Sequence, residues 1–237
     1  WLDQMMAHGQ RREVGVVGVR LINPATHKIQ HVGIIVGLGG YANHPGHEID
    51  GIESLGYMGR SQIDQNLSAV TGACLLIKKS VYEQVGGMDE ERFPIYFNDV
   101  DLCLKTDQCG YKIVWTPYVT LAHVGSVTLN SDRPRSGDRQ EIFFKKIEGP
   151  GNNFIQKWLH QIASDPAYNR ELSLGSDSYT PETAVVVSWD PDIRIRPRVL
   201  GMPLPCRYSE YRIVAPLRVL NVSHQVQSGF VQSSLPN

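Results

Sequence analysis

The chain has 237 residues, of which 41% are hydrophobic and 20% are charged, and its formal net charge is −1 at pH 7. This length allows one large domain or two smaller ones with an ample core. The low net charge provides no overall basic field, so a general polyanion binder is not expected and nucleic acid is not an expected partner. No apolar run reaches the roughly 18–20 residues needed to cross a bilayer, so no transmembrane segment is expected.

The chain begins at Trp1 with "WLDQMMAHG", which is typical of an amphipathic helix already under way and contains no signal-like segment. We therefore expect it to be a piece of a longer protein. The cysteines form no C-x-x-C pair, and we expect reduced structural thiols, which favour a cytoplasmic location. These cysteines are Cys74, Cys103, Cys109 and Cys206.

The first third of the chain contains two apolar runs and then a long irregular segment. "EVGVVGVRLINPATHKIQHVGIIVG" has β-branched runs on both sides of Asn23-Pro24, which predicts a strand hairpin. Segment 38–66 is rich in Gly and His and lacks periodicity, so it is either a binding loop or lid, or a solvated excursion. His44 and His47, spaced i, i+3 within it, admit a metal site, although we expect solvated side chains.

The middle of the chain begins with "LSAVTGACLLIKK", which predicts a buried strand. The following "SVYEQVGG" predicts a helix with a capping box formed by Ser80 and Glu83, and this helix should end at Gly86.

A second helix is predicted from an N-cap at Asn98 to Gly110. "YKIVWTP" predicts a strand that Pro117 breaks, and "NNFIQKWLHQIASD" predicts a third helix from its apolar spacing. The alternation of strands and helices predicts a layered α/β fold. After "GSDSYTPETAVVVSWDPDIRIRPR", which is linker-like, the apolar "RVLGMPLP" predicts a new strand. We expect a first domain at 1–174, a linker at 175–194 and the truncated start of a second domain at 195–237.

Two aspartates, Asp99 and Asp101, lie at the predicted start of the second helix. Unsatisfied backbone N–H groups and the helix dipole favour a charged carboxylate there, which predicts a low pKa and a base at neutral pH. Such a base suits proton abstraction from an alcohol. The alternative is capping. It is preferred for Asp101, which would complete a box with Asn98, whereas both roles are open for Asp99.

His123 follows the predicted strand "VTLA". A neutral imidazole suits a divalent transition metal, but a lone histidine is more often a hydrogen-bonded structural residue.

Four motifs in order resemble the C-terminal half of family 2 glycosyltransferases of the GT-A fold, especially the bacterial enzymes that build O-antigen and other surface polysaccharides. They are "AVTGACLLIKKSVYEQVGGMDE", "FNDVDLCLKTDQCGYKIVWTP", "LAHVGS" and "DPAYNRELSL". The resemblance covers about 1–174 and implies a partial GT-A fold, a mixed sheet with flanking helices that lacks the N-terminal nucleotide-binding part. "RVLGMPLPCRYSEYRIVAPLRVL" resembles the first strand and helix of a GT-B-type glycosyltransferase domain.

The resemblance implies an inverting sugar transfer from a nucleotide-sugar donor to a hydroxyl of a saccharide or lipid-linked saccharide. It also implies a divalent metal, Mn²⁺ or Mg²⁺, in the full-length enzyme, and a location at the cytoplasmic face of the inner membrane. Members carry an upstream D-x-D metal motif in the donor half. Because this half is not present, we expect the isolated chain to be inactive.

The resemblance assigns the general base to Asp99 and a metal ligand to His123. Asn98 stands where the family has the first acidic residue of the pair, so one carboxylate is missing while the base is retained. The substrate-binding positions that we expect from the resemblance are Thr71, Gly72, Ala73, Asn98 and Asp101.

Two other function classes stay open. A non-catalytic GT-A-like module that binds saccharide or a partner enzyme is kept open by the substitution at Asn98. A metal-dependent hydrolase rests only on histidines and aspartates that lack ligand spacing. An intact D-x-D element upstream would favour transfer over binding.

Overall fold

The computed structural model describes residues 1–46, 51–124, 139–175, 178–182, 198–201, 207–222 and 227–230. The chain divides into two compact units, Trp1–Thr180 and Pro181–Asn237. The first unit contains the candidate site.

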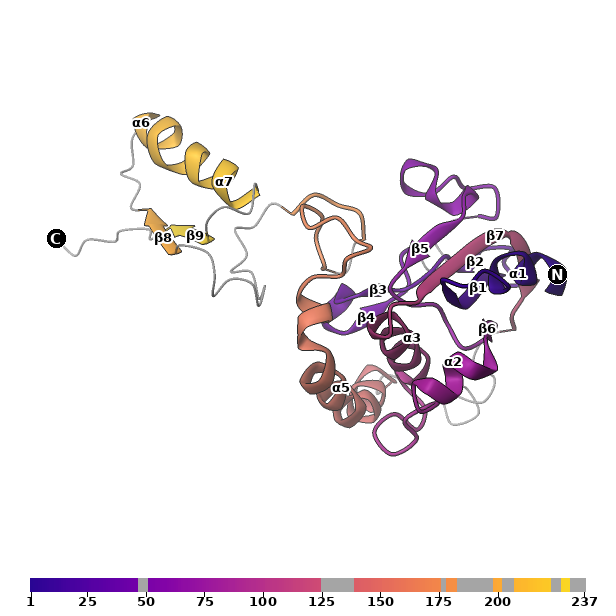
Figure 1. Ribbon diagram of the computed structural model, residues 1–237. Helices are drawn as coiled ribbons and strands as arrows, with labels where there is room; N and C mark the ends of the chain where they lie inside the picture. Colours follow the sequence, from indigo (N-terminus) through magenta and orange to yellow (C-terminus); the bar gives the residue numbers. More distant parts are fainter. Residues whose placement is uncertain are drawn as a thin grey trace. The chain divides into compact units, whose positions relative to one another are not determined.

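A five-stranded mixed sheet forms the centre of the first unit (Figure 1). Within it, β1 lies between the parallel strand β7 on one side and the antiparallel strands β2 and β6 on the other, while β5 pairs antiparallel with β7. A separate antiparallel pair joins β3 to β4. The strands are β1 (Val14–Ile22), β2 (Ile29–His31), β3 (Ile35–Val36), β4 (Ala42–Asn43), β5 (Gln65–Leu67), β6 (Leu75–Ile77) and β7 (Lys112–Ala122).

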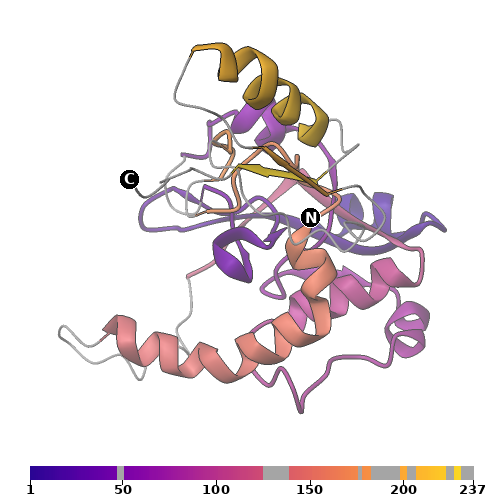
Figure 2. The same ribbon diagram turned by 90° about the vertical axis from the view of Figure 1, so that its left-hand side faces the viewer.

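Helices cover both faces of this sheet. They are α1 (Leu2–Gly9), α2 (Lys79–Gln84), α3 (Asn98–Gln108) and α5 (Arg139–Ala163), with 3₁₀ turns η1 (Leu38–Gly40) and η2 (Tyr57–Gln62). Successive side chains of a strand point to opposite faces. Accordingly, Val16 packs in the cluster formed with α3 and α5, whereas Val17 packs with Met5 of α1. Figures 1 and 2 show α3 and α5 on the same side of the sheet. The predicted α/β layering is confirmed.

Several elements that were predicted from local signals are confirmed. β1 and β2 form the hairpin, whose turn is held by a hydrogen bond from the Ala25 N–H to Asn23 Oδ1 (2.9 Å). α2 ends before Gly86 (φ 77°), and α3 ends before Gly110 (φ 84°). Both glycines adopt the left-handed conformation that commonly ends a helix.

Two strand predictions were wrong. "LSAVTGACLLIKK" is not one strand, because β5 ends at Leu67 and β6 begins at Leu75. The N–H groups of Thr71 and Gly72, which lie between them, donate to side chains and not to a strand partner. Pro117 does not break β7, because the register with β1 shifts at this point and the strand continues to Ala122. The irregularity accommodates a residue that has no N–H group.

The Ser80–Glu83 capping box does not form. α2 begins at Lys79, its N-cap is Lys78, and no side chain caps it. Ser80 therefore lies inside the helix.

The second unit contains a parallel strand pair joined through helices. β8 (Arg198–Gly201) is followed by α6 (Arg207–Ser209), the π-helical turn η4 (Glu210–Val214), α7 (Ala215–Val222) and β9 (Gln227–Phe230). β8 and β9 pair in parallel, so this unit contains a βαβ arrangement. The strand predicted at "RVLGMPLP" is confirmed over Arg198–Gly201, and the rest of this segment lies outside the described residues.

None of the described helices has both the length and the hydropathy needed to cross a bilayer. Cys74, Cys103 and Cys109 are free thiols, and Cys206 lies outside the described residues.

Candidate functional site

A strained turn sets the start of α3. The N-cap residue is Phe97, which has a left-handed backbone (φ 65°), and no side chain caps the helix. This conformation is costly for a residue with a Cβ, and it persists where surrounding contacts hold it. The Phe97 ring stacks on Phe154 of α5, with ring centroids 4.8 Å apart. Asn98 is thus the first helical residue, and the prediction that it is the N-cap was wrong.

The turn places Asp99 against the "TGA" segment at 71–73. Asp99 Oδ2 accepts a hydrogen bond from the Gly72 N–H (2.7 Å), and its Oδ1 accepts one from the Val100 N–H (2.9 Å). A Cβ at Gly72 would lie 3.2 Å from the Cβ of Asp99, so glycine permits this close approach. The structure therefore brings together the residue expected to be the base and a segment expected to bind substrate.

The pKa of Asp99 is raised above its usual value. Burial raises it, and this effect outweighs the lowering by the N–H groups of Gly72, Val100 and Asp99 and by the side chain of Thr71. The low pKa expected from the helix terminus was therefore wrong, because loss of hydration disfavours the charged carboxylate more than these donors favour it. A raised pKa makes the ionised Asp99 a stronger base.

Asp101 is fully buried and belongs to the core. Its Oδ1 accepts a hydrogen bond from Trp158 Nε1–H (2.8 Å) and lies 2.7 Å from Lys157 Nζ, and its Oδ2 lies 3.2 Å from Lys105 Nζ. Residues two apart on a helix point about 200° apart, so Asp101 and Asp99 face opposite ways. The capping role expected for Asp101 was wrong, because no side chain caps α3 and the Asp101 carboxylate joins α3 to α5. Its expected contact with a substrate stays a prediction, which these core contacts do not favour.

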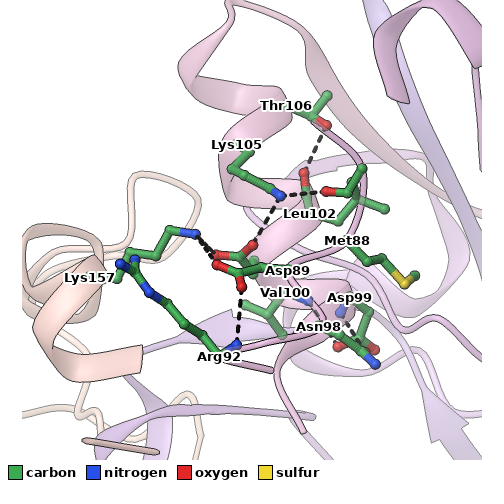
Figure 3. Close-up of polar contacts among 12 residues, drawn as sticks. Met88, Asp89, Arg92, Asn98, Asp99, Val100, Leu102, Lys105, Thr106 and Lys157 are labelled. Carbon is green, nitrogen blue, oxygen red and sulfur yellow. Dashed lines mark hydrogen bonds and ion pairs between the residues drawn. The ribbon is translucent and has the colours of Figure 1, made fainter. Parts of the chain in front are cut away.

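The charged cluster around Asp101 extends to the loop before α3. Lys157 Nζ also lies 3.3 Å from Asp89 Oδ2, and Lys105 Nζ donates to the carbonyl of Gly87. Figure 3 shows Lys105 and Lys157 directed toward carboxyl groups, with Asp99 and Asn98 lying together apart from them. This cluster fixes the helix whose first turn contains Asp99.

Asn98 lies beside the Asp99 backbone. Asn98 is half-buried, and its Oδ1 accepts a hydrogen bond from the Asp99 N–H (2.7 Å). The amide oxygen that replaces the expected carboxylate thus still accepts a hydrogen bond at the start of α3.

Sequence reasoning missed two polar residues of β2, Gln30 and His31. Both are buried. His31 Nε2 accepts a hydrogen bond from the Thr71 N–H (3.3 Å), and Gln30 Oε1 lies 2.9 Å from His123 Nδ1. The available signal was the pair of polar residues inside the apolar run "KIQHVGIIVG", because buried polar groups require partners.

His44 also belongs to this region. Its Nδ1 lies 3.0 Å from His31 Nδ1, and the two rings meet edge to face. The expectation that His44 is solvated was wrong, because its ring is half-buried against His31. His47 lies outside the described residues.

His123 follows β7 directly, and its N–H donates to the Ile22 carbonyl (2.9 Å). Gln30 Oε1 can accept from Nδ1–H, which would leave the Nε2 lone pair as a ligand. Within the ranges that the structure describes, no three His, Cys, Asp or Glu side chains gather as a metal site. The described residues thus fit the contribution of one imidazole ligand and not a complete metal site.

No family model matches the chain. It is 40% identical over 182 residues to the uncharacterized protein y4gI of Sinorhizobium fredii, covering 76% of this chain and 19% of that protein. It is 35% identical over 174 residues to the O-antigen biosynthesis protein RfbC of Myxococcus xanthus, covering 73% of this chain and 13% of that protein. Over 54 residues it is 39% identical to the N-acetylglucosaminyl-diphospho-decaprenol L-rhamnosyltransferase of Mycobacterium tuberculosis. This match covers 23% of this chain and 17% of that protein.

The chain resembles proteins of glycan synthesis. One relative is named for O-antigen biosynthesis and another for rhamnosyl transfer. These names support a glycosyltransferase of polysaccharide biosynthesis at the level of the family. The matches span less than a fifth of the length of these relatives, at 19%, 13% and 17%.

Proposed function

We propose that the first unit is the acceptor-side part of an inverting glycosyltransferase of the GT-A fold. The donor is a nucleotide-sugar, and the acceptor is a hydroxyl of a saccharide or lipid-linked saccharide in surface polysaccharide biosynthesis. The sequence resemblance and the names of the relatives support this proposal.

The observation that carries the proposal is the placement of Asp99. Its carboxyl group lies at the first turn of α3, bonded to the Gly72 N–H of an exposed segment. The nearby Asp101 is buried and forms ion pairs with Lys105 and Lys157. We therefore assign separate tasks to the two carboxylates in this proposal, and Asp99 is the one that would meet a substrate.

Asp99 acts as the general base in this proposal. The acceptor oxygen attacks the anomeric carbon, the bond from that carbon to the nucleoside diphosphate breaks with its electron pair on the phosphate oxygen, and Asp99 takes the hydroxyl proton. A single displacement inverts the anomeric configuration. The raised pKa of Asp99 suits this task, since a base acts best when its pKa lies near the working pH.

His123 is proposed to supply one metal ligand through Nε2, with Gln30 fixing the ring through Nδ1. A bound divalent ion, Mn²⁺ or Mg²⁺, would neutralise charge on the leaving diphosphate. The remaining ligands would come from the donor and from sequence outside the described residues.

The second unit is proposed to begin a GT-B-like domain, since its parallel β8–β9 pair is joined through helices. We place the protein in the cytoplasm, at the inner face of the membrane where lipid-linked acceptors are available.

A transfer assay tests the proposed function. Because the chain matches less than a fifth of its relatives' length, the assay uses the longest natural polypeptide that contains it, with UDP-, GDP- and dTDP-sugars and saccharide acceptors. Asp99→Asn should lower kcat about 10²–10⁴-fold, the usual effect of losing a general base. The control Asp107→Asn removes an exposed carboxylate from the same helix and should leave kcat unchanged. Wild-type activity in Asp99→Asn would refute the assignment of the base.

A further inference from the structure

β2 carries a buried histidine whose two ring nitrogens both face partners. His31 is 1% exposed. Its Nε2 lies 3.3 Å from the Thr71 backbone nitrogen, and its Nδ1 lies 3.0 Å from His44 Nδ1. Because a buried polar group without partners is costly, these contacts define which nitrogen carries the proton.

The Thr71 contact fixes the tautomer of His31. A backbone N–H can only donate, so His31 Nε2 must offer its lone pair. The single proton of a neutral imidazole then resides on Nδ1, and His44 Nδ1 must accept it. The hydrogen bonds therefore run in a fixed order, from the Thr71 N–H to His31 and from His31 to His44.

The same geometry argues against a metal ion between the two histidines. A metal at His31 Nδ1 would need the lone pair on that nitrogen and would move the proton to Nε2. Two N–H groups, those of His31 Nε2 and Thr71, would then face each other at 3.3 Å. A hydrogen-bonded pair satisfies all of these groups, and a chelated ion does not.

The Thr71 amide lies one residue before the amide that holds Asp99. Thr71 N–H donates to His31, and Gly72 N–H donates to Asp99 Oδ2 at 2.7 Å. The next amide, that of Ala73, donates to Thr71 Oγ1 (3.3 Å). Backbone hydrogen bonds thus join segment 71–73 to β2 at Thr71 and to α3 at Gly72.

We propose that His31, oriented by His44, is a positioning residue for Asp99, because it fixes the segment whose Gly72 N–H holds that carboxylate. This inference rests on the proposed function for the task of Asp99. His31 itself does not touch the substrate. Its role is to keep the Gly72 N–H aimed at Asp99 Oδ2 when an acceptor occupies the site.

Nuclear magnetic resonance on the 237-residue chain tests the hydrogen-bond order without any activity. In ¹⁵N-labelled protein, His31 should show its proton on Nδ1, and ¹³C-labelled aspartate should report the titration of Asp99. His31→Leu should raise the midpoint of the Asp99 titration, since the Gly72 N–H lowers that pKa and would be loosened. His31→Gln keeps an acceptor for Thr71 and should stay close to wild type. His27→Asn, at an exposed turn residue with φ 55°, is the control and should change nothing.

Kinetics on the longest natural polypeptide test the positioning role. His31→Leu should lower kcat roughly 10- to 100-fold, the scale expected when a reacting group is misplaced. The KM for the nucleotide-sugar donor should change by less than about twofold in His31→Leu, because segment 71–73 is not expected to determine donor binding. His31→Gln should recover most of the activity.

Three results would overturn the inference. They are a proton on His31 Nε2, an Asp99 titration unchanged in His31→Leu, and stoichiometric Zn²⁺ binding that shifts the resonances of both histidines. A wild-type protein without transferase activity would instead refute the proposed function, and the titration of Asp99 would still decide whether His31 positions it.

Discussion

The substitution Asp101→Asn distinguishes between two roles of Asp101, membership of a buried ion-pair network and simple capping of α3. The substitution preserves the shape of the side chain but removes its negative charge. Asp101 is 0% exposed, and its two lysine partners have side chains only 17% and 22% exposed. The amide would therefore leave Lys105 and Lys157 near each other, and among the described residues Asp89 would remain as a carboxylate partner of Lys157.

The expected loss follows from these contacts. Removing one partner of a buried ion pair typically costs about 3–5 kcal/mol, whereas loss of a capping side chain costs about 1 kcal/mol. We expect a loss of about 3–5 kcal/mol for Asp101→Asn. With an m value of roughly 2 kcal/mol per M of urea, the unfolding midpoint should fall by about 1.5–2.5 M.

Urea unfolding of the 237-residue chain, followed by tryptophan fluorescence, measures this loss. Asp107→Asn is the matched control, because the same substitution is made at an exposed carboxylate of the same helix and should leave the unfolding midpoint close to that of the wild type. Adding Lys157→Gln to Asp101→Asn should recover part of the loss, since one unbalanced charge is removed. A loss of 1 kcal/mol or less for Asp101→Asn would refute the network and restore the capping role.

Three further predictions concern the site. The free energy of unfolding of the wild type should fall as the pH rises through the interval between the unfolded and folded pKa values of Asp99, because its folded-state pKa is raised. Asp99→Asn has no titrating group at this position and should lose that pH-dependent contribution. A difference in unfolding free energy between wild type and Asp99→Asn that does not change with pH would contradict the direction of that shift. Gly72→Ala should lower kcat about tenfold by displacing Asp99, whereas Gly149→Ala, where a Cβ meets nothing within 4 Å, should not; equal rates in both variants would argue against the close approach. His123→Ala should raise the metal concentration that gives half-maximal activity, and an unchanged metal dependence would remove His123 from the ligand set.

Local signals in the sequence predicted much of the fold. The hairpin at Asn23 and the ends of α2 and α3 depend on turn residues and glycines that act within a few positions. The break in "LSAVTGACLLIKK" was not predictable in the same way. It arises because Thr71 and Gly72 donate to side chains 40 and 27 residues away, whose positions depend on the sheet and on α3.

The candidate site shows the same limit. Asp99 could be singled out because a helix start near Asn98 has a local signature, and its contact with segment 71–73 is present in the structure. The burial of Asp101 could not be predicted, since its partner Trp158 lies 57 residues along the chain. Gln30 and His31 were missed because their partners, His123 and Thr71, are 93 and 40 residues away.

The pH dependence of kcat/KM, compared between wild type and Asp99→Asn, tests the central claim most directly. Asp99 must be ionised to take the acceptor proton, so kcat/KM should fall as the pH drops through its pKa. Because that pKa is raised, the fall should begin above the value of about 3.9 that is usual for aspartate. Asp99→Asn should lose this acidic limb together with about 10²–10⁴-fold of the rate. An acidic limb that persists unchanged in Asp99→Asn would contradict the assignment of Asp99 as the general base.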